Sequence, residues 1–280
     1  VLPPQKVTQG VIRFKIREIN LGQLKFNSLS SESLVDPKLL QDIQANHLDN
    51  NTNNFLEKVS SLTDFINDQP GVSAYSRLTA SNTTDAVDVN IDLNPDAPIN
   101  KWFSLSNFGS RSTGEGRVST GVQWNNLSGR FDQASLSLSA SEGLKQIAGS
   151  YNQLVNANGL RLGVSASYLD YDVTQSGAVD SDGTASSLSL TSTMPLHTSR
   201  GKKNAFANLK TNRMKDYTVN VETGDRKVHG FEFGLSGTDF IFSDALAANY
   251  NLSATYGYVD LKGNQTAYTA DAATADSHGR

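Results

Sequence analysis

Apolar and small polar residues alternate repeatedly along the chain between residues 117 and 258. In residues 134–140, alanine and leucine fill the even positions and serine fills the odd positions. Residues 160–168 and 246–258 alternate in the same way, with mostly serine, glycine, asparagine or threonine between the apolar side chains. Successive side chains of a β-strand point to opposite faces, so each segment would present one apolar and one polar face. The alternation therefore predicts strands of a sheet with one apolar surface.

About nine such strands are predicted after Pro98, and no helix is predicted there. They lie near residues 102–109, 113–125, 132–142, 145–154, 160–173, 185–195, 204–220, 227–239 and 245–262. Lengths above about nine residues suit a tilted transmembrane strand. Short turns, such as residues 156–159, alternate with longer polar loops, such as residues 175–183. This arrangement is typical of an outer-membrane β-barrel, although the sheet of a soluble protein gives a similar pattern.

Helical periodicity is confined to the first hundred residues. Asp36 is a favourable N-cap, and Pro37 suits the first helical position, where a missing N–H costs no hydrogen bond. The apolar side of this helix is formed by Leu39, Leu40 and Ile43. A second helix is predicted over residues 54–68, where apolar residues recur at three- and four-residue spacing.

Strands flank the two predicted helices. One is predicted over residues 11–19 and another near residues 23–26, before the first helix. Residues 72–80 and 86–93 are predicted to form a hairpin after the second helix, because apolar and polar residues alternate in them. Residues 21–94 are therefore predicted to be a compact α+β module with the order strand, helix, helix, strand, strand.

Composition removes several classes of function. The chain has 280 residues, a formal net charge of −4 and no cysteine. The charge argues against a nucleic-acid partner, which needs a concentrated basic face. The absence of cysteine removes disulfides and thiolate metal sites, and the four histidines lack metal-ligand spacing. No catalytic constellation is found, so we expect neither an enzyme nor a cofactor or bound metal.

A set of short motifs links the α+β module to the strands that follow. The most specific is residues 106–114, from Ser106 to Gly114, just before the second long strand. Smaller matches are Leu2-Pro3-Pro4-Gln5, Phe55-Leu56-Glu57, Asn67, Pro70-Gly71-Val72, Asn125-Asn126 with Asp132, Tyr151-Asn152 and Gly159. With these residues the chain resembles the outer-membrane two-partner secretion transporters of the haemolysin-activator and filamentous-haemagglutinin-transporter type.

The resemblance implies a fold class and a domain order. Residues 1–19 would be the end of a first POTRA domain and residues 20–96 a second POTRA domain, an α+β fold. Residues 99–280 would be the N-terminal part of an antiparallel transmembrane β-barrel, truncated at about nine strands. The chain is expected to be part of a longer protein. The barrel would lie in the bacterial outer membrane, in contact with its lipid, and the POTRA domains in the periplasm.

The resemblance also implies a function. Such a monomeric transporter exports an unfolded exoprotein, which carries an N-terminal secretion domain, without hydrolysing nucleotide. POTRA domains capture extended substrates by strand addition to an exposed sheet edge. Candidate substrate-binding residues are Leu39, Leu40, Ile43, Tyr75, Arg77 and Leu78. Candidate pore-lining residues on the polar face of the strands are Arg111, Arg117 and Arg161.

Simpler roles stay open for these residues. The leucines and Ile43 can belong to the core of the α+β module, and the arginines can be solvated charges without a specific role. Two other functions also stay open. One is an outer-membrane assembly factor of the same superfamily, and the other is a soluble, secreted, β-rich binding protein.

Overall fold

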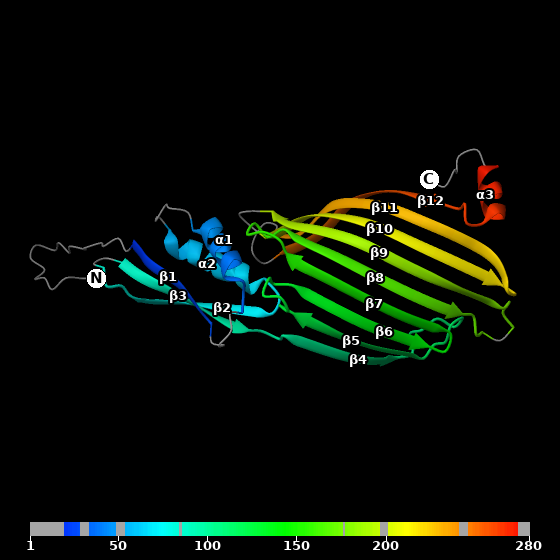
Figure 1. Ribbon diagram of the computed structural model, residues 1–280, viewed down its shortest axis with the longest axis horizontal. Coiled ribbons are helices and arrows are strands. Elements are labelled where there is room, and N and C mark those ends of the chain that lie inside the picture. Colours follow the sequence, from blue (N-terminus) through cyan, green and yellow to red (C-terminus); the bar gives the residue numbers. More distant parts are fainter. Residues whose placement is uncertain are drawn as a thin grey trace, which may run out of the picture. The chain divides into compact units, whose positions relative to one another are not determined.

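The computed structural model describes residues 20–28, 34–48, 54–83, 86–175, 177–196, 201–240 and 246–273. The chain divides into two compact units, Val1–Asp96 and Ala97–Arg280 (Figure 1). Within the described residues, no helix is long and apolar enough to cross a membrane.

The first unit has the predicted order of elements. These are β1 (Asn20–Ser28), α1 (Pro37–His47), α2 (Phe55–Asn67), β2 (Val72–Ala80) and β3 (Ala86–Pro95). The strands form a sheet in the order β1-β3-β2, in which β1 is parallel and β2 antiparallel to β3. Both helices and the three strands predicted from residue 23 onward are confirmed. The strand predicted over residues 11–19 lies outside the described residues.

Local signals in the sequence set the helix start and the core of this unit. The Asp36 side chain accepts a hydrogen bond from the Lys38 N–H at 2.9 Å, which caps α1 as expected. The apolar sides of both helices and alternate residues of β3 form the core. It includes Leu39, Ile43, Val59, Leu62, Ile66, Val89, Ile91 and Leu93, all buried. The polar side chains that alternate with them, Asp88, Asn90, Asp92 and Asn94, lie on the opposite face of the sheet.

The second unit is a nine-stranded sheet in which every strand pairs antiparallel with its neighbours in sequence (Figure 1). Its strands are β4 (Ile99–Ser106), β5 (Arg117–Asn125), β6 (Gln133–Ser141), β7 (Leu144–Leu154), β8 (Arg161–Asp172), β9 (Ser181–Leu196), β10 (Lys202–Thr218), β11 (Val221–Phe240) and β12 (Ala247–Asp260). The predicted number of strands in this region is confirmed for the described residues. Within these residues β4 and β12 each have one unpaired edge.

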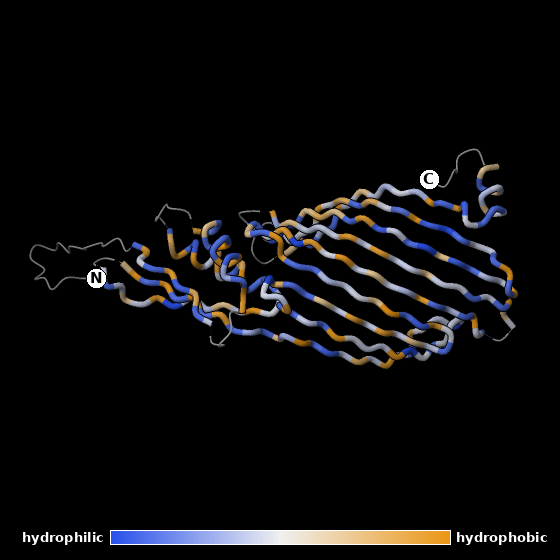
Figure 2. The backbone as a smooth tube through the Cα atoms, in the orientation of Figure 1, coloured by the Kyte–Doolittle hydropathy of each residue, from blue (hydrophilic) through white to orange (hydrophobic). Residues whose placement is uncertain are grey.

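The two faces of this sheet differ in polarity, as the alternating colours along the strands in Figure 2 show. Thr120, Leu138, Ile147 and Tyr168 pair across four strands in one row of the apolar face, and all four side chains are exposed. Serine hydroxyls form hydrogen-bonded cross-strand pairs on the other face. These pairs are Ser119–Ser139 at 2.8 Å, Ser135–Ser150 at 2.8 Å and Ser167–Ser187 at 2.7 Å. An exposed apolar face on so large a sheet indicates a partner or a membrane.

Two expectations for this unit are wrong. A helix, α3 (Gln265–Ala272), follows β12, although none was predicted after Pro98. The Asn264 side chain caps α3 by accepting a hydrogen bond from the Ala267 N–H at 2.9 Å. None of the residues of α3 is buried. Without a buried apolar stripe, periodicity cannot reveal such a helix. The loop predicted over residues 175–183 also ends early, because β9 begins at Ser181 and pairs there with β8.

Candidate functional site

Strand β2 is an edge strand, since within the described residues it pairs with β3 alone. The Asn67 side chain accepts a hydrogen bond from the Ala74 N–H at 2.6 Å and donates one to the Ala74 carbonyl at 3.1 Å. Ala74 therefore directs its backbone groups away from β3. Because this direction alternates along a strand, Ser76, Leu78 and Ala80 direct theirs to the same free edge. Asn67 thus covers the start of this edge, and the half from Ser76 onward can accept another strand.

Side chains around this edge are exposed. Tyr75 is 63% exposed and Leu78 is 53% exposed. Leu78 is paired with buried Val89, so it lies on the helix side of the sheet, whereas Tyr75 is paired with Asp92 on the polar side. The edge therefore offers an apolar contact on one face and an aromatic ring on the other.

Arg77 belongs to a polar ladder across all three strands. Its Nη2 lies 2.7 Å from Asp92 Oδ2, and the Asn27 side chain donates to Asp92 Oδ1 at 3.0 Å. In the same ladder the Gln23 N–H donates to Asp88 Oδ1 at 2.8 Å. This hydrogen bond, with that of the Ser81 hydroxyl, holds the pKa of Asp88 below its ordinary value. The guanidinium of Arg77 is thus held toward β3, over the polar face of the sheet.

Leu39, Leu40 and Ile43, three of the candidate substrate-binding residues, lie in the core of the first unit and not on its surface. Their exposed fractions are 4%, 7% and 0%, and they pack inside the first unit. A fully buried side chain cannot contact a substrate without unfolding its surroundings. These three residues therefore support the edge through the core.

Replacing Ile43 with alanine is expected to destabilise the first unit by about 2–5 kcal/mol, because it leaves a cavity in the core. The measurement is the urea midpoint of the helical circular dichroism signal of the full-length protein. Exposed Gln41 on the same helix is the matched control, and Gln41→Ala should leave the midpoint unchanged. An unchanged midpoint in Ile43→Ala, together with weaker exoprotein binding, would contradict the core role.

Arg117 lies on the polar face of the nine-stranded sheet and is held by two neighbouring strands. Its Nε donates to the Ser139 hydroxyl at 2.7 Å, and its Nη2 donates to Gln146 Oε1 at 3.4 Å. These contacts keep the guanidinium flat against β6 and β7. The polar face there is a surface of hydroxyls with a fixed positive charge.

Arg161 is the first residue of β8, and its side chain reaches the turn between β5 and β6. Its Nη2 donates to the Phe131 carbonyl at 2.8 Å and to the Asn152 side chain. Phe131 and Asp132 are 0% exposed. The Ser128 N–H and hydroxyl both donate to Asp132 Oδ1, at 2.9 and 2.7 Å, whereas Oδ2 has no hydrogen-bond partner among the described residues. Arg161 is thus the centre of a buried polar cluster that fixes this turn.

The charge of Asp132 explains part of this arrangement. Burial alone would raise the pKa of its carboxyl, but hydrogen bonds from Ser128 and from the backbone N–H groups of Asp132 and Arg130 together outweigh that effect and hold the pKa below its ordinary value. Asp132 is therefore ionised at neutral pH, and Arg161 is the cation that acts on it electrostatically. A buried carboxylate needs such a countercharge.

Arg111 belongs neither to the polar-face contacts of Arg117 nor to the turn cluster of Arg161. It is in the loop between β4 and β5, its side chain is 87% exposed, and its Nε lies 3.3 Å from Glu115 Oε1. The loop itself is tied to the neighbouring strand ends: the Gly143 N–H donates to the Thr113 carbonyl at 2.8 Å, and the Thr174 N–H donates to the Ser112 carbonyl at 2.8 Å. Arg111 therefore lies at the end of the sheet and Arg117 on its polar face.

Aromatic rings on the polar face lie over glycines of the neighbouring strand. The directly paired residues are Trp102–Gly121, Tyr171–Gly183 and Phe206–Gly234. A Cβ at each glycine would lie within 2.5–2.7 Å of the ring. Covering a glycine in this way stabilises a curved sheet. The Tyr171 hydroxyl also crosses β9 to donate to Asp216 on β10 at 2.8 Å.

Two important residues were not identified as site residues from the sequence. Asn67 binds the backbone groups of Ala74 at the start of the free edge, and Asp132 carries the buried charge of the turn. Both are parts of the motif set given above, but spacing alone does not show that an asparagine at a helix end will bind a strand seven residues later. Such contacts depend on how the helix packs on the sheet.

Comparison with known proteins gives matches over most of the chain. The family of the haemolysin secretion/activation protein ShlB/FhaC/HecB matches residues 85–277, which is more than half of the sequence. The heme/hemopexin transporter protein HuxB of Haemophilus influenzae (strain ATCC 51907 / DSM 11121 / KW20 / Rd) is 31% identical over 173 residues, or 61% of this chain. The chain spans only 30% of the length of that relative.

Solved structures show the same fold. CdiB from Escherichia coli is similar with a TM-score of 0.68 and 18% identity, over 92% of this chain and 48% of CdiB. CdiB from Acinetobacter baumannii has a TM-score of 0.62 and 17% identity, over 93% of this chain and 49% of that protein. At these identities the similarity concerns the fold, including the large antiparallel sheet.

Proposed function

Because the chain belongs to the family of the haemolysin secretion/activation protein ShlB/FhaC/HecB, we propose that the complete protein exports an unfolded exoprotein in two-partner secretion. The export crosses the bacterial outer membrane. The nine-stranded sheet with one exposed apolar face and one polar face is the observation that carries this proposal. A sheet of this kind is suited to contact lipid on one side and an aqueous conduit on the other.

The domain assignment is part of the proposal. Residues 20–96 act as a POTRA domain in the periplasm, preceded in residues 1–19 by the end of another. Residues 99–280 supply part of a transmembrane barrel. A bilayer tolerates no open sheet edge, so strands outside this sequence pair with β4 and β12. The complete barrel acts as a monomer.

Capture begins at the free edge of β2. An extended segment of the exoprotein's N-terminal secretion domain adds to this edge, beginning at Ser76, because Asn67 already occupies the backbone groups of Ala74. The new backbone hydrogen bonds provide affinity, and Leu78 and Tyr75 provide contacts on the two faces. Arg77, held by Asp92 of β3, places a positive charge on the polar face of the strand that the segment joins.

Passage follows the polar face. Serine pairs and the fixed guanidinium of Arg117 exchange hydrogen bonds with a moving backbone. Arg161 fixes the turn between β5 and β6 and so the shape of that end of the conduit. No step requires a nucleotide or a cofactor.

The test is secretion in a strain that carries the exoprotein and lacks this gene. We expect the exoprotein in the medium when the full-length wild-type protein is restored, and only in the periplasm or degraded when it is absent. The matched control is an unrelated outer-membrane porin expressed to the same level, which should not restore secretion. Equal secretion with and without the gene would contradict the proposal.

A further inference from the structure

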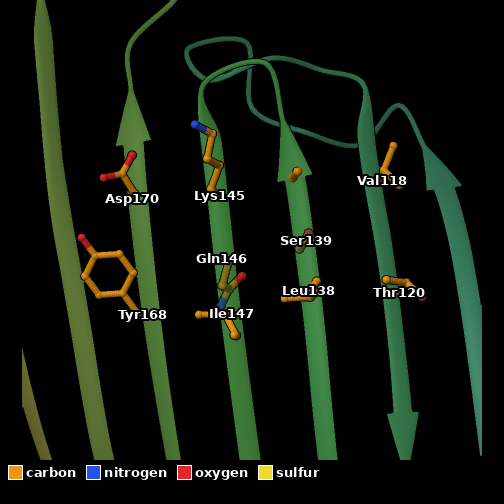
Figure 3. A pocket seen from close by; sticks show the side chains of 10 residues that line it. Val118, Thr120, Leu138, Ser139, Lys145, Gln146, Ile147, Tyr168 and Asp170 are labelled. Atoms are coloured by element: carbon orange, nitrogen blue, oxygen red, sulfur yellow. The ribbon is translucent and has the colours of Figure 1, made fainter.

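A hollow of 540 Å³ lies on the apolar face of the nine-stranded sheet, over strands β5 to β8 (Figure 3). Its apolar wall is formed by Val118, Leu138, Ile147 and the ring of Tyr168. It lies near the strand ends where β6 turns into β7. This location is the end of the sheet opposite to the start of β4.

Strand register explains why the face is hollowed here. One row across β5 to β8 is Thr120, Leu138, Ile147 and Tyr168, and the next is Val118, Ala140, Lys145 and Asp170. The small side chains of Thr120 and Ala140 leave space between larger neighbours. Ser139 also faces away, because its hydroxyl binds Arg117 on the polar face.

The rim of this hollow carries a cation. Lys145 lies in the outermost row, and in the described part of the chain no carboxylate is within 4.0 Å of its ammonium group. Asp170 is directly opposite in register and lines the same rim, but it makes no ion pair with Lys145. A lysine stem can extend along apolar surface while its charge stays at the polar boundary.

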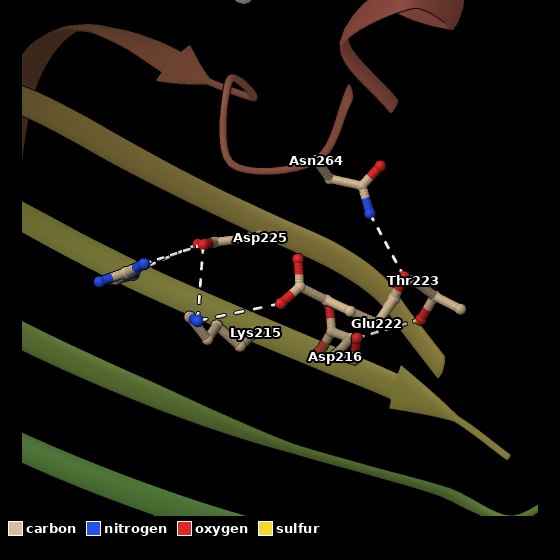
Figure 4. A network of polar contacts seen from close by, with 7 residues as sticks. Lys215, Asp216, Glu222, Thr223, Asp225 and Asn264 are labelled. Carbon is tan, nitrogen blue, oxygen red and sulfur yellow. Dashed lines mark hydrogen bonds and ion pairs between the residues drawn. The ribbon is translucent and has the colours of Figure 1, made fainter. Parts of the chain in front are cut away.

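A second hollow on the same face lies next to a group of ion-paired residues. It measures 330 Å³ and is lined by Leu190, Leu209, Phe231 and Tyr256, among others. Arg213 in the charged region beyond it is bound by Asp225 at 2.8 Å, and Lys215 lies 3.7 Å from the same carboxylate (Figure 4). Arg213 and Lys215 share the Asp225 carboxylate, whereas the cation on the rim of the first hollow, Lys145, has no ion pair among the described residues.

We propose that the hollow over β5 to β8 binds an acyl chain of a phosphorylated lipid of the outer leaflet, with the lipid phosphate against the Lys145 ammonium. The proposal rests on the proposed function, which places the start of β4 on the periplasmic side and therefore this hollow on the outer side. An apolar hollow with an aromatic ring and an unneutralised cation at its rim is complementary to an anionic amphiphile. Tyrosine rings are enriched at this depth of a membrane.

The test measures binding of bis-phosphorylated lipid A to the full-length protein in nonionic detergent by native mass spectrometry. Lys145→Gln is expected to weaken binding about fivefold, which corresponds to about 1 kcal/mol for one basic residue at a membrane surface. Lys145→Arg should retain the affinity. Ala140 lines the hollow, so the larger side chain in Ala140→Trp should fill it and weaken lipid binding without a change of charge.

Three controls separate this site from unspecific lipid. Dephosphorylated lipid A should bind to wild type and Lys145→Gln equally. Arg111→Gln removes an exposed charge outside the hollow and should have no effect. Asp170→Asn removes a negative charge from the rim and should tighten binding. Equal binding of the phosphorylated lipid by wild type and Lys145→Gln, or equal binding of both lipids by wild type, would overturn the proposal and indicate an annular lipid only.

The lipid-binding result for the Lys145 variants does not depend on the secretion assay. Secretion and outer-membrane fractionation of the wild-type protein test the proposed function, whereas the Lys145 series compares variants of one purified protein. Lys145→Gln is expected to secrete at the wild-type level. If Lys145→Gln no longer prefers the phosphorylated lipid but still secretes normally, the lipid site is supported. If the wild-type protein is absent from the outer membrane, the proposed function on which the site rests is wrong.

Discussion

Ser76→Pro is expected to weaken capture of the exoprotein about five- to tenfold while the protein still folds and inserts. The Ser76 N–H points to the free edge of β2, as the pairing of Ala74 with Asn67 shows. Proline removes this donor, and a proline is tolerated where the N–H of an edge strand faces outward. The loss of one backbone hydrogen bond, at about 0.5–1.5 kcal/mol, gives the expected factor. The measurement is binding of the exoprotein's secretion domain to the full-length protein, followed by secretion in cells.

Ser76→Ala is the matched control, because it removes the side chain and keeps the N–H. We expect it to bind and secrete like wild type. The urea midpoint of the helical circular dichroism signal should be similar in all three proteins. If Ser76→Pro binds the secretion domain like wild type, strand addition at this edge is wrong. If Ser76→Ala weakens binding as much as proline, the side chain and not the backbone carries recognition.

Arg161→Gln is expected to destabilise the nine-stranded unit by about 1–3 kcal/mol. The change removes the donor to the Phe131 carbonyl and to the Asn152 side chain, both inside the turn cluster. It also leaves the Asp132 carboxylate, which is 0% exposed, without its countercharge. A buried charge that has lost its partner is more costly than the lost hydrogen bonds alone. The measurement is the midpoint of thermal unfolding of the full-length protein in detergent.

Arg111→Gln is the control for this change, since Arg111 is an exposed arginine of the same unit. Surface ion pairs contribute about 0–1 kcal/mol, so its midpoint should stay close to that of wild type. The double variant Arg161→Gln with Asp132→Asn should recover part of the stability, because the buried charge is gone. A wild-type midpoint in Arg161→Gln would show that the turn cluster does not depend on the charge pair.

Among the described residues, helices and strands with a clear local sequence pattern were predicted, and those parts that lack such a pattern were missed. The Asp36 cap and the apolar sides of α1 and α2 are local, and the sequence predicted both helices. Helix α3 was missed because it buries nothing and has only the Asn264 cap to mark it. The start of β9 was missed because pairing with β8, which lies earlier in the chain, extends that strand into a polar segment.

The candidate site shows the same division between local and long-range effects. Tyr75 and Leu78 lie exposed on opposite faces of an edge strand, and the alternation in residues 72–80 already separates their faces. The buried position of Leu40 and the coverage of the edge by Asn67 depend on how α1 and α2 pack on the sheet. The motifs that carried the family resemblance contained Asn67 and Asp132, but not the contacts that these residues make.

Strand number, the polarity of the two faces and the α+β order of the first unit were determined by the sequence alone. A period of two or of 3.6 residues is a property of neighbouring positions, so it is visible without a fold. Only the tertiary structure decided which half of the β2 edge is open, which carboxylate is buried beside Arg161 and which lysine lies unpaired at a hollow. Each of these depends on residues distant in sequence that meet through strand register and helix packing.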